Sequence, residues 1–473
     1  MLLSKYWNLK KVVLAINGKF TQGAGDAAVS TIATNSKTIK AGELFWAIEG
    51  GKFNGNDFVA DALKKGAQGA VVSRDFNLRA FSPEAALIRV ESGLAALGRF
   101  AQAHRLNFSK LQVVAVTGSN GKTTTKEMIG KVLSAQAPSF INPGNFNNEV
   151  GCPLSVLELK ETYQYAVFEL AARHKGDIGY LASIARPSVA VLTNVSSAHL
   201  ETFGNVETIF ETKSEILNGL SSGDSVIYYA EDSRLARLPS VRPGFRYTSF
   251  GLSPSADVQG KIRAVMPQGL AMDIFYKAQA QGMVKLRMNG KIAALNALAA
   301  FACGLNLLIP VEKIIEALEN FYPMAQRGET FELVNKLFQA KHIVVNDAYN
   351  ANPVSMKEGV LGFLEAYKEY PKIVVLGQMR ELGKEEFVLH EETARKIVTE
   401  GNTLLNSKTA FVLVGGESAR RMAGVLPGAV CLSKEKVRDY LLEKLTKARD
   451  SCALYFKASR AEALETIIEE LKS

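Results

Sequence analysis

Residues 117–125, Thr-Gly-Ser-Asn-Gly-Lys-Thr-Thr-Thr, have the composition and spacing of a loop that holds phosphate groups. The loop follows the apolar run 113–116 and precedes an amphipathic helical pattern. Backbone N–H groups there can bind phosphate oxygens, Lys122 can reach the β- and γ-phosphates, and Thr123 can ligate Mg²⁺. The general P-loop pattern has glycine where this chain has Val116. We therefore predict a nucleoside triphosphate site formed by Gly118, Ser119, Asn120, Gly121, Lys122, Thr123 and Thr124.

Three further residues lie where they could take part in the same chemistry. Glu169 ends the apolar run 165–169, and a carboxylate at the carboxyl end of a parallel strand would face a bound nucleotide. His199 stands just beyond the apolar run 189–194, and Lys213 lies in a helical segment. Taken singly, each of the three also fits an ordinary surface position, so none of them decides the function alone.

Together these features resemble the Mur ligase family of ATP-dependent amide-bond synthetases, from about Thr34 to at least His390. The resemblance implies three α/β domains. The first would bind a UDP-sugar, the second would be a P-loop ATPase with a mostly parallel sheet, and the third would be Rossmann-like. It also implies a reaction in which the γ-phosphoryl group of ATP moves to a substrate carboxylate. An amine then attacks the acyl phosphate, giving an amide, ADP and phosphate.

Three segments resemble one branch of that family. Residues 142–154, 346–356 and 375–383, the last with His390, are similar to the branch that joins D-alanyl-D-alanine to a UDP-N-acetylmuramoyl-tripeptide in peptidoglycan synthesis. The branch that adds the third residue would carry Asp-Tyr-Ala-His-Thr-Pro at position 347, and its diaminopimelate-specific forms carry Asp-Asn-Pro-Arg. Neither string occurs in the sequence. The implied partners are therefore D-alanyl-D-alanine and a tripeptide whose third residue is diaminopimelate or lysine.

The resemblance also implies roles for individual residues. A carbamylated lysine is an anionic oxygen ligand of the kind that Mg²⁺ prefers, and two Mg²⁺ sites are expected. Catalysis would depend on Lys122, Glu169, His199 and Lys213, and the metal ligands would be Thr123, Glu169, His199 and carbamylated Lys213. ATP would also contact Asn296, Arg327 and Asp347, and the substrates would contact Ser36, Asn147, Asn148, Tyr349 and Asn350.

The chain departs from the family pattern at three places. In 35–37, asparagine and lysine flank the serine where the family usually has aspartate and arginine. Residues 54–56 are Asn-Gly-Asn in place of Asp-Gly-His. Ahead of Asn296 the family commonly has histidine and asparagine, whereas this chain has Ile292 and Ala293, whose side chains form no hydrogen bonds. We expect adenine to be held by Asn296 and by packing.

The elements that must position these residues are short apolar runs that alternate with helical stretches from residue 111 onward. Such alternation predicts an α/β fold with parallel sheets covered on both faces. Residues 244–288 carry few helix signals and are expected to add antiparallel strands. We place the domains at 1–108, 109–324 and 325–473. The predicted strands are 111–116, 165–170, 189–194, 225–229, 342–347, 373–377, 410–415 and 453–457.

Three other segments have recognisable patterns. Apolar residues spaced over 9–16 predict a helix that Gly18 ends. Residues 23–28 are similar to a dinucleotide fingerprint, but they follow a helix where the fingerprint must follow a strand, so we reject that site. Residues 292–311 carry no charge, yet their alanine-rich content is too weakly apolar for a membrane span. We expect a helix buried inside a domain there.

The composition is that of a globular protein with a weakly basic balance. The 473 residues include 56 Lys and Arg against 47 Asp and Glu, a formal net charge of +9. No run of five basic residues occurs, which argues against a nucleic-acid-binding arm or a polybasic membrane anchor. The four cysteines lie far apart and match no zinc motif, as expected in a reducing compartment. We expect a monomeric cytoplasmic enzyme with neither nucleic acid nor membrane as partner.

Three other functions compete with this interpretation. The first is a sibling ligase that adds diaminopimelate or lysine, or a folylpolyglutamate synthase, and the Asn-Ala-Asn-Pro context at 350–353 argues against it. The second is a nucleotide-binding protein without catalysis, which the joint presence of the four catalytic candidates opposes. The third is a P-loop protein that acts on nucleic acid, but no basic stripe with interleaved aromatic residues occurs.

Overall fold

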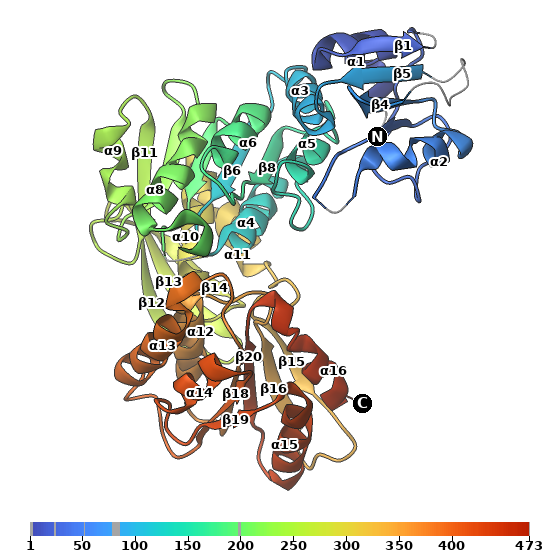
Figure 1. Ribbon diagram of the computed structural model, residues 1–473. Helices are drawn as coiled ribbons and strands as arrows, with labels where there is room; N and C mark the ends of the chain where they lie inside the picture. The colour runs from blue at the N-terminus through green and yellow to red at the C-terminus, as the bar shows by residue number, and fades with distance from the viewer. Residues whose placement is uncertain (1–2, 23–24, 52, 78–85, 197–199, 473) are drawn as a thin grey trace.

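The computed structural model describes residues 3–22, 25–51, 53–77, 86–196 and 200–472. Within them the chain forms three α/β units in sequence order, each built on its own sheet (Figure 1). The second unit contacts both of the others. The predicted α/β class with mostly parallel sheets is confirmed.

The first sheet has five described strands in the order β1-β5-β4-β3-β2, and among them only β1 and β5 pair antiparallel. Helix α1 (Leu9–Ile16) confirms the helix expected from the apolar spacing, and the Asn8 side chain caps it by accepting the N–H of Lys11. Asn17, rather than Gly18, takes the left-handed conformation that ends the helix, with a φ of 54°. The other elements are β1 (Lys19–Gln22), β2 (Ile32–Ala33), β3 (Leu44–Trp46), β4 (Gly69–Ser73), β5 (Ala86–Val90), α2 (Val59–Lys64) and α3 (Gly93–Arg105).

The second sheet has nine strands within the described residues, in the order β14-β13-β12-β11-β10-β9-β6-β8-β7. Strand β6 (Gln112–Thr117) leads into the phosphate-binding segment and lies between β8 (Tyr165–Glu169) and β9 (Val189–Leu192), parallel to both. The antiparallel strands expected within 244–288 are also present. The remaining strands are β7 (Ser139–Ile141), β10 (Ser225–Tyr229), β11 (Arg246–Gly251), β12 (Val258–Met266), β13 (Gly269–Tyr276) and β14 (Gln279–Leu286).

Helix α10 (Lys291–Asn306) is the buried helix expected from the charge-free segment. It packs against α4 (Lys122–Ser134), and the alanines along it allow the two helices to approach closely. The segment is not one continuous helix, because Leu308 has a φ of 57° and α11 (Val311–Glu319) begins after it. The other helices of this unit are α5 (Gly151–Val156), α6 (Asp177–Ala185), α7 (Leu200–Phe203), α8 (Val206–Ser214) and α9 (Leu238–Val241).

The third sheet has the order β15-β16-β20-β17-β18-β19, and β15 alone among its described strands pairs antiparallel. All eight strands predicted along the chain occur, with ends that differ by at most two residues. The strands of this sheet are β15 (Glu329–Leu333), β16 (His342–Asn346), β17 (Lys372–Leu376), β18 (Thr409–Val414), β19 (Val430–Leu432) and β20 (Ala453–Lys457). Its helices are α12 (Pro353–Ala366), α13 (Glu386–Glu400), α14 (Glu417–Ala423), α15 (Lys434–Lys447) and α16 (Glu465–Lys472).

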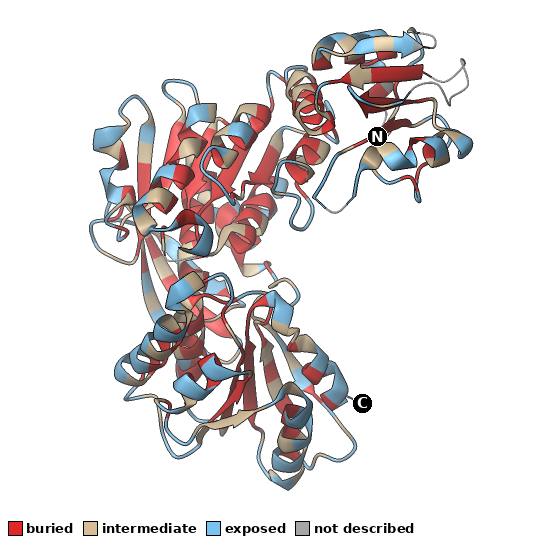
Figure 2. Ribbon diagram, in the orientation of Figure 1, coloured by how far each residue is buried: buried red, intermediate tan, exposed pale blue. Residues whose placement is uncertain are grey.

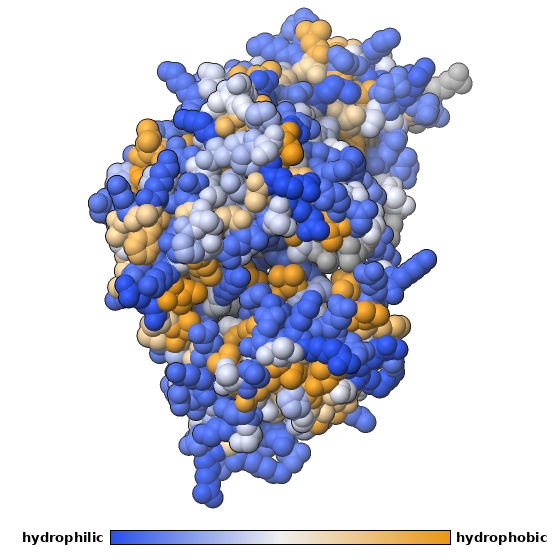
Figure 3. Space-filling view, turned by 90° about the vertical axis from the view of Figure 1, so that its left-hand side faces the viewer, coloured by the Kyte–Doolittle hydropathy of each residue, from blue (hydrophilic) through white to orange (hydrophobic). Residues whose placement is uncertain are grey.

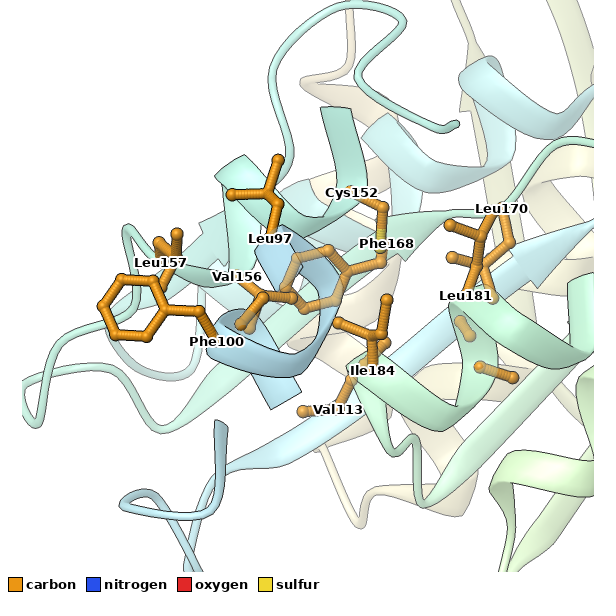
Figure 4. Close-up of a cluster of buried hydrophobic side chains, with 14 of the residues drawn as sticks. Leu97, Phe100, Val113, Cys152, Val156, Leu157, Phe168, Leu170, Leu181 and Ile184 are labelled. Carbon is orange, nitrogen blue, oxygen red and sulfur yellow. The ribbon is translucent and has the colours of Figure 1, made fainter. Parts of the chain in front are cut away.

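The first and second units share one continuous hydrophobic core. Figure 4 shows Leu97 and Phe100 of α3 in the same cluster as Val156 of α5, Phe168 of β8 and Ile184 of α6. Buried residues line the sheets of every unit, while the outer faces of the helices are exposed (Figure 2). Separating the first two units would expose part of their common core to water. Each Å² of apolar surface exposed in this way would cost about 25 cal/mol of free energy.

The second and third units meet through hydrogen bonds and a close backbone approach. Tyr367 of α12 donates its hydroxyl hydrogen to the carbonyl of Pro267, in the hairpin that extends toward the third unit (Figure 1). A Cβ atom on Gly362 would lie 2.7 Å from the Cα of Gly290, so the two backbones nearly touch. Val265 of the same hairpin also packs against the hydrophobic core of the third unit, but the two units keep separate cores, unlike the first two.

No helix within the described residues is long and apolar enough to cross a membrane. Helix α10, which contains most of the charge-free segment that raised the question, has 16 residues. Hydrophilic residues cover most of the face shown in Figure 3, with hydrophobic residues gathered in separate patches.

Truncation of Phe301 tests the packing of α10 in the second unit. Its side chain is 0% exposed, so Phe301→Ala leaves a large cavity, and we expect the free energy of unfolding to fall by about 3–5 kcal/mol. Phe53→Ala is the matched control, because Phe53 is 74% exposed and its truncation should change stability by less than about 0.5 kcal/mol. Urea unfolding followed by circular dichroism measures both. Equal effects of the two substitutions would contradict the packing described here.

Candidate active site

The phosphate-binding loop lies between the end of β6 and the start of α4. Gly121 immediately precedes the helix with a φ of 78°, a conformation that glycine adopts most readily. Two residues that follow β9 hold the loop. Asn194 Oδ1 accepts the N–H of Asn120 at 3.0 Å, and Thr193 Oγ1 donates to the Asn120 carbonyl at 2.6 Å. The N–H groups at the start of α4 face an anion site that the helix dipole strengthens.

The Lys122 ammonium lies over this loop. Its Nζ atom donates to the carbonyls of Gly118 at 2.7 Å and Ser119 at 3.1 Å. Desolvation lowers the pKa of Lys122, while the nearby charge of Glu169 opposes that shift and the charge of Arg327 adds to it. The ammonium is thus held where it can stabilise negative charge on a phosphate bound in the loop.

Glu169, at the end of β8, is oriented by two asparagines. Its backbone N–H donates to Asn142 Oδ1 at 3.0 Å, and Asn147 Nδ2 donates to Glu169 Oε1 at 2.7 Å. The residue is only 2% exposed, yet Oε2 has no hydrogen-bond donor among the described residues. Because a buried carboxylate oxygen without a partner is unfavourable, this atom is suited to coordinate a cation.

Two of the predicted Mg²⁺ ligands, Thr123 and Glu169, lie where they could bind the ion together with phosphate oxygens. Mg²⁺ usually takes one or two carboxylates, and phosphates and waters supply its other ligands. Thr123 and Glu169 line one cleft. No group of three or more His, Cys, Asp and Glu side chains that could hold a metal occurs among the described residues. His199, the third predicted ligand, lies outside the described residues.

Lys213, the fourth predicted ligand, is near the end of α8 and is 3% exposed. Burial, together with the positive charge of Lys122, lowers its pKa from 10.5 to about 7, while the charge of Glu169 acts in the opposite direction. Its Nζ atom lies 6.0 Å from the centre of the Phe203 ring. The side chain therefore interacts electrostatically with Lys122 and Glu169, although Lys213 does not line the cleft.

A cleft of about 770 Å³ lies between the second and third units and collects most of the predicted site. Ile292 and Ala293 form part of its wall, next to Asn296, whose Oδ1 accepts the Thr125 hydroxyl hydrogen at 3.1 Å. Gly118 is not among the lining residues, although its carbonyl binds Lys122. The predicted residues that line the cleft are Ser119, Asn120, Gly121, Lys122, Thr123, Thr124, Asn147, Glu169, Asn296, Arg327, Asp347, Tyr349 and Asn350.

The third unit supplies charged groups that face the loop. The Arg327 guanidinium stacks over the Tyr349 ring at 3.8 Å. Asp347 Oδ2 accepts from Lys457 Nζ at 2.6 Å and from the Tyr455 hydroxyl at 2.8 Å. Burial, followed by the charge of Asp347, raises the pKa of Tyr455 well above 10, so its hydroxyl remains a donor to the carboxylate.

Two predicted substrate residues lie away from the cleft lining. Asn148 Oδ1 accepts the N–H groups of Val150 and Gly151, so that side chain shapes the start of α5. Ser36 is buried in the first unit, where Lys65 Nζ donates to its carbonyl at 2.9 Å. The structure therefore does not bring either residue to the phosphate-binding loop.

The sequence patterns missed Lys457 and Asn352, which line the cleft, and Asn142, which contacts Glu169. Lys457 ends a predicted strand, and that position could have drawn attention to it. Asn352 lies in the quoted segment 346–356; it caps α12 and its Nδ2 donates to Asn120 Oδ1. Asn142 likewise lies in a quoted segment, but its contact with the Glu169 backbone cannot be deduced from spacing.

His390 has a structural role. Its Nε2 accepts the N–H of Met379 at 2.9 Å, and its Nδ1 contacts the Glu386 carbonyl at 2.7 Å. Burial lowers the pKa of His390, which favours the neutral ring that this pair of contacts requires. His390 therefore holds the loop after β17, which carries residues of the cleft wall.

Comparison with known proteins identifies relatives of the whole chain. The Mur ligase middle domain matches residues 116–304, and a model described as Mur ligase family, catalytic domain, matches residues 28–105. A relative from Bacillus subtilis (strain 168), named UDP-N-acetylmuramoyl-tripeptide–D-alanyl-D-alanine ligase, is 32% identical; the match covers 93% of this chain and 92% of that protein.

Solved structures give the same result. A MurF from Acinetobacter baumannii is 31% identical, with a TM-score of 0.88 and coverage of 98% of each chain. A MurF ligase from Thermotoga maritima, solved in complex with ADP, is 30% identical, with a TM-score of 0.80 and coverage of 93% of this chain and 97% of that one.

Replacement of Gly121 tests the geometry of the loop. A Cβ atom there would lie 2.3 Å from Asn296 Oδ1, and the φ of 78° is strained for alanine. We expect Gly121→Ala to weaken ADP binding by at least about tenfold, which corresponds to a strain of about 1.4 kcal/mol in the bound loop. Isothermal titration calorimetry measures this. Gly424→Ala is the control, because Gly424 has a helical φ of −65° and only ordinary contacts. Unchanged ADP affinity in Gly121→Ala would refute the role of the loop.

Proposed function

The chain belongs to the Mur ligase family, and from this membership we propose that it joins D-alanyl-D-alanine to a UDP-N-acetylmuramoyl-tripeptide while ATP is converted to ADP and phosphate. The product is a UDP-N-acetylmuramoyl-pentapeptide for peptidoglycan synthesis. The observation that carries this proposal is the match along nearly the whole chain to relatives of that one name. The cleft supports it, because one cavity joins a phosphate-binding loop to a second unit that faces it.

The first chemical step brings two anions together. The γ-phosphoryl group of ATP moves to the C-terminal carboxylate of the tripeptide and forms an acyl phosphate. At 4 Å and an effective dielectric constant near 20, each pair of like charges repels by roughly 4 kcal/mol. Lys122 of the second unit and Arg327 of the third are two of the cationic side chains that line the cleft, and we assign them to the triphosphate.

Mg²⁺, when bound, would neutralise the remaining negative charge of the phosphates and of the substrate carboxylate. We assign one ion to Thr123 and Glu169, and a second to Glu169, His199 and a carbamate on Lys213. The unpartnered Oε2 of Glu169 supports the first assignment. The second is supported by the electrostatic coupling of Lys213 to Glu169.

Carbamylation of Lys213 requires its neutral amine. The amine nitrogen attacks CO₂, an N–C bond forms, and one proton is released as the anionic carbamate appears. A pKa of about 7 leaves a large neutral fraction at neutral pH, whereas an ordinary lysine has almost none. The same burial that makes an ammonium unfavourable thus favours its conversion to an anionic ligand.

The second step uses the third unit. The amine of D-alanyl-D-alanine attacks the acyl carbon, the amide bond forms, and phosphate leaves. We propose that Tyr349 and Asn350 help to hold the dipeptide, while Arg327, Asp347 and Asn296 contact ATP. All five residues line the same cleft, which supports contact with the two ligands there.

We further propose that the units correspond to residues 1–108, 109–324 and 325–473, with Ser36 in a UDP-sugar site of the first. The limits of the three sheets support these boundaries. A single chain supplies the loop, Glu169 and the residues of the facing unit, which supports action as a monomer.

One assay tests the amine specificity. We expect phosphate release from ATP, Mg²⁺ and UDP-N-acetylmuramoyl-tripeptide to be stimulated by D-alanyl-D-alanine and not by single amino acids. Lys122→Ala should abolish release, because the triphosphate then lacks its lysine contact. A full-length chain stimulated only by diaminopimelate, lysine or glutamate would instead be a sibling ligase.

The titration of Lys213 gives a pH-dependent prediction. In buffers freed of CO₂, activity should fall and then recover when bicarbonate is added. Recovery should increase as pH rises through about 7, because the neutral amine then becomes the major form. Lys213→Ala should lose most activity, and a small carboxylic acid should restore part of it. Near-normal turnover of Lys213→Ala in the phosphate-release assay would rule out the carbamate.

A further inference from the structure

Lys126 is a fully buried lysine that the proposed reaction leaves without a role. It lies one turn beyond Lys122 on α4, and its side chain is 0% exposed. Burial of an ammonium is costly unless its three N–H groups are all satisfied. Here Nζ donates to the carbonyl of Asn142 at 2.7 Å and to that of Gly144 at 3.3 Å, and it pairs with Glu127 Oε1 at 2.9 Å. Every donor of the ammonium therefore has an acceptor.

The two carbonyls belong to the loop that orients Glu169. Asn142 is fully buried, its N–H donates to the Val167 carbonyl at 3.1 Å, and its Nδ2 donates to the Phe146 carbonyl at 2.9 Å. Asn142 Oδ1 then accepts the Glu169 N–H, and Asn147 from the same loop donates to Glu169 Oε1. The loop thus contacts both the backbone and one carboxylate oxygen of Glu169.

We propose, on the basis of the metal role assigned above to Glu169, that Lys126 is a positioning residue that locks loop 142–147 so that Glu169 turns its free Oε2 toward the metal. The loop is anchored to α4 by Lys126, and α4 begins at the phosphate-binding loop. The metal carboxylate and the phosphate site are thereby fixed to the same helix.

The contact pattern explains why a charged group serves this purpose. A hydrogen bond from an ammonium to a carbonyl is stronger than a neutral one, and one Nζ atom draws two carbonyls toward a single point. Asn142 and Gly144 are two residues apart, and their carbonyl groups both accept from Lys126 Nζ. Gly144 has a φ of 51°, a left-handed conformation that turns the chain at this point. A neutral, non-donating side chain of the same length would leave the buried carbonyl of Asn142 and the carbonyl of Gly144 without that donor.

The experiment compares Lys126→Met with Lys131→Met, an exposed lysine of the same helix, in the full-length chain. ADP binding is titrated calorimetrically in EDTA and at graded Mg²⁺ concentrations, and Mn²⁺ binding to the ADP complex is followed by electron paramagnetic resonance. We expect Lys126→Met to raise the half-saturating Mg²⁺ concentration by about 10–100-fold, as for other residues that orient a metal ligand. Its metal-free ADP affinity should change by less than about twofold, and Lys131→Met should match the parent in both measurements.

Two results would overturn the proposal. One is an unchanged Mg²⁺ dependence in a folded Lys126→Met chain. The other is an equal loss of ADP affinity with and without metal, which indicates a structural effect on the whole site. If Lys126→Met does not fold, Asn147→Ala removes the bond to Oε1 from the same loop. It should give the same metal-specific loss, and an unchanged Mg²⁺ dependence there would also contradict the proposal.

Glu169→Gln separates this proposal from the metal assignment on which it depends. If Glu169→Gln leaves the Mg²⁺ dependence of ADP binding unchanged, the metal role of Glu169 is wrong. If it weakens Mg²⁺ binding while Lys126→Met does not, the metal role stands and the positioning role of Lys126 fails.

Discussion

The arrangement of the second unit depends on one buried carboxylate. Glu169 is removed from water with one oxygen bonded to Asn147 and the other without a donor among the described residues. Such a group is unfavourable alone, and so is an ammonium buried as deeply as that of Lys213. Each of these charges lowers the electrostatic penalty of the other, and a cation at Oε2 would lower it further. The end of β8 and the last turn of α8 bring these charges together before a ligand arrives.

Much of this arrangement follows from local sequence. Strands β6, β8, β9 and β10 are apolar runs, so their positions could be predicted to within two residues, and Glu169 was identified because it ends one of them. The loop before α4 has a spacing that few other functions require. These features depend on residues that are adjacent in the chain, so they can be predicted from a single sequence.

The residues that escaped prediction depend on partners distant in the chain. Asn352 binds Asn120 across 232 positions, and Lys457 binds Asp347 across 110. Lys126 has the helical spacing of an ordinary polar residue, and only the fold turns loop 142–147 over it. Asn148, a polar side chain in a recognised segment, accepts backbone N–H groups at the start of α5, and its contact with a substrate stays a prediction. Residue type alone cannot separate a group that contacts a ligand from one that supports its neighbour.

The second and third units keep separate hydrophobic cores, which bears on how the cleft between them can open. Water can replace the hydrogen bond from Tyr367 to Pro267, and each such exchange changes the free energy by only about 0.5–1.5 kcal/mol. Parting the first two units would instead expose a common hydrocarbon core. If the molecule opens, we expect it to do so along the junction that borders the cleft, and domain movements of this kind take microseconds to milliseconds. ADP, phosphate and the lengthened peptide can then diffuse away without any loosening of the framework that holds the charged groups.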